Sequence, residues 1–284
     1  MSGIRTHWFE ALNPPIYLVS VLPGLAVPLL AGGMPAHALG LALATFAVVL
    51  LQHAINLFND AADWRLGADV DKQDSWVRVH AGRVRPVIVH AVISMLLGGL
   101  LGLSVLWLQG QWWIVPIALP LLVLGYLYNA GPRPLSYTHF GEWVTGVCYG
   151  PGVFGGLWLV AGQPLDTRLV AGALAFAALA MALLLSHQPP QIETDRAAGK
   201  HSFAVRYGAQ ATRRAAFMLF LLFVAATLAG SALLLAWPWF ALLSAIAVPI
   251  VLRLSPGMVN PKRILVAASA LIGAGLSFTL LSQH

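Results

Sequence analysis

Charged side chains are scarce in this sequence. They make up 9% of the 284 residues, whereas hydrophobic residues make up 59%. A typical soluble domain carries about 25% charged residues, so this chain has too little charge to cover a water-facing surface. Cysteine is rarer still. The single residue Cys148 excludes an internal disulfide, and its apolar surroundings indicate a small packing residue.

Basic residues outnumber acidic ones, 16 to 10, and the pI is near 9.9. A basic balance is typical of nucleic-acid-binding proteins, but in so apolar a chain it indicates the cytoplasmic loops of a membrane protein. We therefore expect membrane lipid around the chain and no nucleic acid as a partner. A cleavable signal peptide is not expected, because the start MSGIRTHWFEALNPP lacks the basic-then-apolar order of one.

Six stretches of the chain contain no Asp, Glu, Lys or Arg. They are residues 11–59, 86–132, 143–165, 169–192, 215–252 and 264–284. A helix needs about 20 apolar residues to cross a bilayer, so the three longest stretches can hold two helices each and the others one each. Turn-forming segments at 31–37, 108–113 and 236–240 divide the long stretches. The sequence predicts an all-α membrane protein of nine transmembrane helices around a central cavity, in a single polytopic domain over residues 1–284.

The charged residues predict the orientation of these helices. With the N-terminus in the cytoplasm, 15 of the 16 basic residues fall inside, Arg168 being the exception, as the positive-inside rule requires. Nine of the ten acidic residues share that face, and only Asp166 does not. The sequence thus predicts a multi-pass protein of a bacterial inner (cytoplasmic) membrane, with its active site on the cytoplasmic side. An alternative explanation stays open. Charged residues of both signs are expected in the longer loops of any membrane protein, and this would account for much of the gathering of acidic residues on one face.

The end of the second expected helix carries the first acidic motif, NLFNDAADWRLGADVD at residues 56–71. If the helix continues through it, Asn56, Asp60 and Asp63 fall at i, i+4 and i+7. This spacing places one amide and two carboxylates on a single helix face, pointing into the bundle.

A second motif, SHQPPQIETDRAAGK, ends the sixth expected helix at residues 186–200, and Gln191 and Asp195 are again four positions apart. Basic, glycine-containing loops follow both motifs, at 81–86 and 198–208. We interpret this as a weak internal repeat of helices 1–4 and 5–8, with helix 9 added and the two halves facing each other across the cavity.

Carboxylates at a membrane interface are costly unless they are paired or bind a metal ion. Oxygen ligands at this spacing suit Mg²⁺, which commonly bridges carboxylates to the phosphates of a substrate. A diphosphate headgroup at the cytoplasmic face with its tail among helices describes an isoprenoid diphosphate. The alternative is a set of helix-end acids paired with loop arginines, and this alternative is favoured for Asp69, Asp71 and Asp74, which lie beyond the expected helix end.

At these residues the chain resembles the UbiA superfamily of intramembrane prenyltransferases, and most of all the branch that prenylates 1,4-dihydroxy-2-naphthoate in menaquinone and phylloquinone synthesis. The first motif is similar to the N-D-x-x-D-x-x-x-G-x-D element of that branch. Residues 128–142, YNAGPRPLSYTHFGE, resemble its Y-x-A-G-P-x-P-L-x-Y-x-x-x-G-E segment, and IETDRAAGKHSFAVRYG resembles the tail of its second motif. The matches extend from about residue 8 to residue 208.

The resemblance implies an Mg²⁺-dependent enzyme that ionises a polyprenyl diphosphate and transfers the prenyl group to an aromatic quinone precursor. It implies that Mg²⁺ neutralises the departing diphosphate and that the protein positions the two substrates. The residues it points to are Asn56, Asp60, Asp63, Gln191 and Asp195 as metal ligands, Lys200 and Arg133 as diphosphate contacts, and Tyr128 as a ring that shields the allylic cation. Asp60, Asp63, Asp195 and Tyr128 are then the catalytic residues. An interfacial role for Tyr128 and plain loop charge for Lys200 and Arg133 stay open.

The second motif departs from the family pattern N-Q-x-P-D-x-E-x-D, because His187 replaces the Asn and Gln191 replaces the first Asp. Gln191 can still offer a carbonyl oxygen to Mg²⁺ but removes a negative charge. His187 is a poor Mg²⁺ ligand, which leaves packing, a hydrogen bond near the cavity or general-base catalysis as its role. Glu193 could replace the lost carboxylate if Pro189 and Pro190 alter the helix geometry.

Two other functions stay open at this point. The same fold could cyclise a lipid diphosphate or use a different acceptor, or the chain could be a non-catalytic lipid-binding membrane protein. The incomplete second motif favours the latter, and the intact set of Asn56, Asp60 and Asp63 argues against it. The sequence leaves the acceptor, the prenyl chain length and the oligomeric state open.

Overall fold

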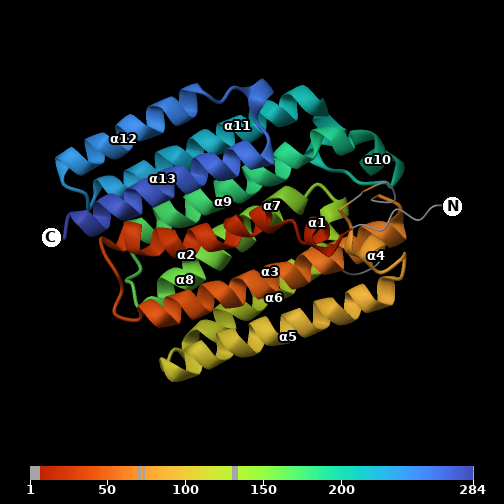
Figure 1. Ribbon diagram of the computed structural model, residues 1–284, viewed down its shortest axis with the longest axis horizontal. Coiled ribbons are helices and arrows are strands. Elements are labelled where there is room, and N and C mark those ends of the chain that lie inside the picture. The colour runs from red at the N-terminus through yellow and green to blue at the C-terminus, as the bar shows by residue number, and fades with distance from the viewer. Residues whose placement is uncertain (1–6, 69–71, 73, 130–133, 284) are drawn as a thin grey trace.

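A computed structural model describes residues 7–68, 72, 74–129 and 134–283. The described residues form helices and connecting turns, with the long helices roughly parallel to one another (Figure 1). The long helices are α2 (Leu18–Ala31), α3 (Ala38–Leu66), α5 (Val84–Leu108), α6 (Val115–Asn129), α9 (Thr167–His187), α11 (Phe203–Ala232), α12 (Trp237–Leu252) and α13 (Pro261–Leu281). The short helices are α1 (Trp8–Leu12), α4 (Trp76–Val79), α7 (Gly141–Val147), α8 (Gly155–Val160) and α10 (Ile192–Ala197).

Within this described part of the chain, eight helical segments are long and apolar enough to cross a membrane, and α12 is a shorter apolar helix. The prediction of nine helices agrees with this count when α12 is included. The three predicted turns are confirmed: α2 ends at Ala31 and α3 begins at Ala38, α5 ends at Leu108, and α12 begins at Trp237.

The outer surface of the bundle is apolar. On α5, which packs chiefly against α3, the large side chains of Ile93, Leu96, Leu97 and Leu100 are all more than half exposed. Such a continuous apolar face is stable only in a lipid environment. The inner surface contains the aromatic cluster of Phe154, Trp158, Phe176, Phe220 and Phe223, whose side chains are almost completely buried. The chain is an integral membrane protein.

One end of the bundle carries the short helices α1, α4 and α10 (Figure 1, right). The long helix α3 delivers the first acidic motif to this end, because it continues to Leu66 and stops where Gly67 adopts φ 84°, a left-handed conformation that suits glycine. The helix therefore continues through Asn56, Asp60 and Asp63, as predicted.

Helix α9 delivers the second motif to the same end but does not continue through it. It ends at His187, a short 3₁₀ turn forms over Pro189–Gln191, and α10 begins at Ile192. The two prolines lack the backbone N–H that a continuous helix needs, and the helix is broken at this point, one of the two possibilities that the sequence left open. Gln191 consequently precedes α10 while Asp195 lies within it.

Candidate active site

A cavity of about 590 Å³ lies inside the bundle, within the size range typical of small-molecule sites. Its wall is mostly apolar and comes from α2, α3, α5, α6, α7, α8 and α9, with the π-helical turn that joins α7 to α8. The hydroxyl, amide and imidazole side chains that line it are Ser20, Gln52, Asn56, Tyr128, Thr145, Tyr149 and His187. Asn56 and Tyr128, two of the site residues named from the sequence, therefore line the cavity.

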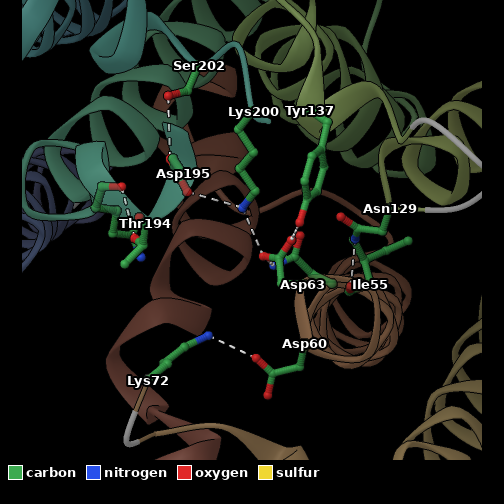
Figure 2. Close-up of polar contacts among 12 residues, drawn as sticks. Ile55, Asp60, Asp63, Lys72, Asn129, Tyr137, Thr194, Asp195, Lys200 and Ser202 are labelled. Atoms are coloured by element: carbon green, nitrogen blue, oxygen red, sulfur yellow. Dashed lines mark hydrogen bonds and ion pairs between the residues drawn. The ribbon is translucent and has the colours of Figure 1, made fainter. Parts of the chain in front are cut away.

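Asp60 lies one helical turn beyond Asn56, and only 4% of its surface is exposed. Its Oδ1 accepts a hydrogen bond from Lys72 Nζ at 2.9 Å, and its Oδ2 accepts one from the backbone N–H of Trp76 at 2.6 Å. Figure 2 shows Lys72 approaching Asp60 from the loop that follows α3. The carboxylate is thus ion-paired and hydrogen-bonded, as a buried charge requires.

Asp63 lies about one helical turn further along the same face of α3, with its carboxylate directed toward Tyr137 and Lys200 (Figure 2), and is 2% exposed. The Tyr137 hydroxyl donates to Oδ1 at 2.8 Å, while Asn59 Nδ2 and Lys200 Nζ donate to Oδ2 at 2.9 and 3.1 Å. This carboxylate therefore joins α3 to two distant segments, the turn at Leu135–Tyr137 and the loop after α10.

Asp195 completes the group from the second motif. It is 5% exposed, with Lys200 Nζ 3.5 Å from its Oδ1 and the Ser202 hydroxyl 3.4 Å from its Oδ2. The backbone N–H of Lys200 also donates to the Asp195 carbonyl at 2.8 Å, and Gly199 between them has φ 76°. This glycine turn after α10 directs Lys200 back toward the carboxylates.

The structure thus brings the two predicted motifs together, because Lys200 contacts both Asp63 and Asp195. Gln191 lies nearby at the N-cap of α10 and is partly buried. Glu193 does not replace the missing carboxylate, since its side chain is 84% exposed and pairs with Arg196. Arg133 lies outside the described residues.

Sequence reasoning missed Asn59, Lys72 and Tyr137 as partners of the carboxylates. Asn59 precedes Asp63 by four positions, a spacing that could have revealed it. Tyr137 lies in the quoted 128–142 segment, where only Tyr128 received a role. The Nζ of Lys200 lies 4.8 Å from the centre of the Tyr137 ring, so this tyrosine contacts both members of the Asp63–Lys200 pair.

Glu142 and Gln188 form a second buried polar group beside the site. Glu142 Oε1 accepts hydrogen bonds from Gln188 Nε2 at 2.9 Å and from the backbone N–H of Phe203 at 2.7 Å. Gln188 Oε1 in turn accepts from the N–H of Ala204 at 3.2 Å. These bonds hold the start of α11, and so the loop that carries Lys200, against α7 and the end of α9.

The donor atoms of the site fit a magnesium ion. They are hard oxygens, which Mg²⁺ prefers, and Lys200 shows that Asp63 and Asp195 converge on a single cation. Two carboxylates are the number that Mg²⁺ commonly takes from a protein, with waters and substrate phosphates completing its shell. Among the residues that the structure describes, no group of three or more His, Cys, Asp or Glu side chains is close enough to hold an ion.

Buried carboxylates paired with lysines, at the end of an apolar cavity in a membrane protein, are typical of a membrane enzyme that acts on a lipid with an anionic head. Residues 19–263 match the UbiA prenyltransferase family. The chain belongs to this family and is an integral-membrane prenyltransferase.

Several curated proteins are similar over most of the chain. The 1,4-dihydroxy-2-naphthoate octaprenyltransferase of Mycobacterium tuberculosis is 33% identical, covering 87% of this chain and 84% of that protein. The 2-carboxy-1,4-naphthoquinone phytyltransferase of Synechocystis is 31% identical, covering 72% of this chain and 67% of that protein.

Solved structures share the fold. A UbiA homologue from Aeropyrum pernix superposes with a TM-score of 0.69 at 18% identity, over 92% of this chain and 96% of that one. A UbiA homologue from Archaeoglobus fulgidus, solved with GPP and Mg²⁺ bound, superposes with a TM-score of 0.65 at 17% identity, over 96% of this chain and 99% of that one.

Proposed function

We propose that this chain transfers a polyprenyl group from its diphosphate to a hydroxylated naphthoate, in an Mg²⁺-dependent reaction. The observation that carries this proposal is the convergence of the buried carboxylates of Asp63 and Asp195 on one cation, at the end of a cavity lined by Asn56 and Tyr128. The names of the similar curated proteins supply the acceptor class.

In the proposed mechanism, the donor tail lies in the apolar cavity and its diphosphate lies at the carboxylates. Asp63 and Asp195 would hold one Mg²⁺, with the amide oxygen of Gln191 as a further ligand, and Asp60 and Asn56 would offer their oxygens to a second Mg²⁺. When bound, Mg²⁺ would neutralise the negative charge of the departing diphosphate.

The other residues bind and shield the reacting groups. Lys200 and Lys72 present ammonium groups to the carboxylates, and their N–H groups would donate to phosphate oxygens of the bound donor. Arg133, outside the described residues, is proposed as a further diphosphate contact. The ring of Tyr128 faces the cavity and would shield the allylic cation after the C–O bond breaks. The acceptor ring then attacks this cation and loses a proton.

The location of the protein is part of the proposal. The carboxylate end of the bundle would face the cytoplasm of a bacterial cell, in the cytoplasmic membrane, because the basic loops lie at that end. The chain from residue 1 to 284 would form a single membrane domain.

The test is a transfer assay on membranes that contain the protein. Labelled polyprenyl diphosphate and 1,4-dihydroxy-2-naphthoate should give a prenylated product when Mg²⁺ is present and none when it is chelated. Asp60→Ala should lose this activity, whereas Glu193→Gln should keep it, because Glu193 is exposed away from the site. The absence of product across donors of several lengths and a panel of aromatic acceptors would overturn the proposal. Mass spectrometry of the product would reveal cyclisation or a different acceptor.

A further inference from the structure

Two side chains that line the cavity carry a buried polar atom with no hydrogen-bond partner among the residues the structure describes. These atoms are Gln52 Oε1 and His187 Nε2. Buried polar atoms in proteins are nearly always hydrogen-bonded, so each exception needs an explanation. Both atoms lie in the wall of one otherwise apolar cavity. A few polar groups in an apolar wall are typical of a site that orients a small molecule.

Gln52 presents an acceptor to this cavity. Its Nε2 donates to the backbone carbonyl of Ile16 at 3.2 Å, which fixes the amide and leaves Oε1 as the free atom. A carboxamide oxygen can only accept a hydrogen bond. Gln52 can therefore bind a ligand that has a hydrogen-bond donor, such as a ring hydroxyl. Ser20, in contrast, interacts with the hydroxyl of Tyr149 across the wall.

His187 supplies the second polar contact. It is the last residue of α9, and its Nε2 is buried with no hydrogen-bond partner in the described part of the chain. The site carboxylates lie at the same end of the bundle, since Asp195 follows after the proline turn and Lys72 and Asp74 are within electrostatic reach of the imidazole. An imidazole nitrogen can donate or accept a hydrogen bond, so it can contact a second oxygen of the same ligand.

The positions of Gln52 and His187 indicate which of the two substrates, the donor or the acceptor, they contact. Gln52 lies two helical turns before Asp60 on α3, so it is displaced from the carboxylates toward the cavity interior. A ring bound beside Gln52 would lie within the cavity that holds the first carbons of a donor whose diphosphate is at Asp60 and Asp63. A prenyl tail has no polar atom to offer to Gln52 or His187, whereas a hydroxylated aromatic acid has several.

We propose that Gln52 and His187 are the acceptor-binding pair, with Gln52 Oε1 accepting from a ring hydroxyl and His187 Nε2 contacting a second oxygen of a hydroxylated aromatic acid. This assignment rests on the proposed prenyl transfer and deepens it by naming the residues that position the acceptor. It also gives His187, which departs from the family pattern, a role at the acceptor rather than at the metal.

The test is a binding measurement that does not need turnover. Titration of the full-length protein in detergent with 1-hydroxy-2-naphthoate and with 2-naphthoate, followed by calorimetry, isolates the contribution of the hydroxyl group. The wild type should bind the hydroxylated probe about tenfold more tightly, the value of one or two hydrogen bonds. Gln52→Met should abolish this preference, and His187→Phe should weaken binding of both probes by about tenfold.

Two further variants separate a binding role from a structural one. His187→Gln keeps a polar atom near the position of Nε2 and should restore most of the affinity. Ser186→Ala is the matched control, because the neighbouring Ser186 hydroxyl already donates to the Leu183 carbonyl at 2.7 Å and does not line the cavity. Its affinity for both probes should equal that of the wild type.

Binding of the prenyl donor is the comparison for these two variants. Affinity for geranyl diphosphate with Mg²⁺ should be unchanged in Gln52→Met and His187→Phe. Loss of diphosphate affinity in place of naphthoate affinity, an unchanged hydroxyl preference in Gln52→Met, or no naphthoate binding by the wild type would each overturn the assignment. Hydroxyl-dependent binding by a wild type that forms no prenylated product would support the acceptor site and overturn the transferase proposal.

Discussion

The Nζ atom of Lys200 lies 3.1 Å from Oδ2 of Asp63, although the two residues are 137 positions apart in the sequence. The same ammonium is 3.5 Å from Asp195, and the side chains of all three residues are at most 12% exposed. One lysine therefore forms ion pairs with a buried carboxylate from each acidic motif.

This arrangement predicts that Lys200→Met destabilises the protein in the absence of metal ions. Breaking a buried ion pair by removing one partner costs about 3–5 kcal/mol, because a charge is left uncompensated. If Asp63 and Asp195 bind Mg²⁺, added Mg²⁺ should raise the thermal unfolding temperature of the variant more than that of the wild type. Scanning calorimetry in detergent, with and without Mg²⁺, measures both effects.

Arg196→Met is the matched control for this measurement. It removes another cation paired with an acid, but the Arg196 and Glu193 side chains are 54% and 84% exposed. Exposed ion pairs contribute about 0–1 kcal/mol, so this variant should unfold like the wild type and respond normally to Mg²⁺. Equal Mg²⁺ responses in Lys200→Met and the wild type would contradict metal binding at Asp63 and Asp195.

Gln191 gives a second prediction, because it stands where the family pattern has an acid. Gln191→Asp adds a negative charge at the N-cap of α10, a position that also favours acids through the helix dipole. The variant should retain or raise prenyl transfer and should reach half-maximal activity at a lower Mg²⁺ concentration. A rise in the Mg²⁺ requirement would show that Gln191 does not face the metal.

The sequence predicted the membrane fold and the position of the first motif well, because both depend on local patterns. Uncharged stretches of about 20 residues indicate membrane-spanning helices, and the spacing of Asn56, Asp60 and Asp63 indicates that they share one helix face. The spacing did not reveal that Asp60 and Asp63 would take different partners, Lys72 on one side and Lys200 with Tyr137 on the other. Those contacts come from loops whose course depends on tertiary packing.

The second motif was harder to predict for the same reason. The two prolines indicated a broken helix, but the direction in which α10 leaves the break is set by contacts with α11. That direction buries Asp195, and Glu193, two positions earlier in α10, lies on the opposite face and is exposed, as the helical spacing indicated. The internal repeat remains a prediction.

Glu142 gives a third prediction, on the stability of the loop that carries Lys200. Glu142→Ala would leave the Gln188 amide and the Phe203 N–H without their acceptor. An unsatisfied buried donor costs about 1–3 kcal/mol, so the variant should lose at least about 2 kcal/mol and unfold at a lower temperature. Glu142→Gln keeps one acceptor oxygen and should lose less. Equal unfolding temperatures for the two variants would contradict this role of the carboxylate.

The last prediction concerns the length of the donor and uses a glycine in the cavity wall. Gly156 lines the cavity, has helical backbone geometry, and an added Cβ there would meet no atom within 4 Å. Gly156→Leu should therefore fold, and its side chain should occupy part of the 590 Å³ cavity. Transfer from a long polyprenyl diphosphate should fall by at least about tenfold relative to transfer from geranyl diphosphate, since fitting the longer chain would force a poorly packed or displaced tail.

Gly273 of α13 is the matched control. An added Cβ there also meets no atom within 4 Å, but Gly273 is exposed and does not line the cavity. Gly273→Leu should therefore leave the ratio of long-donor to short-donor transfer unchanged. Rates measured with donors of increasing length test both variants together. A Gly156→Leu variant with the wild-type length profile would mean that the prenyl tail leaves the cavity by another route, between helices toward the lipid.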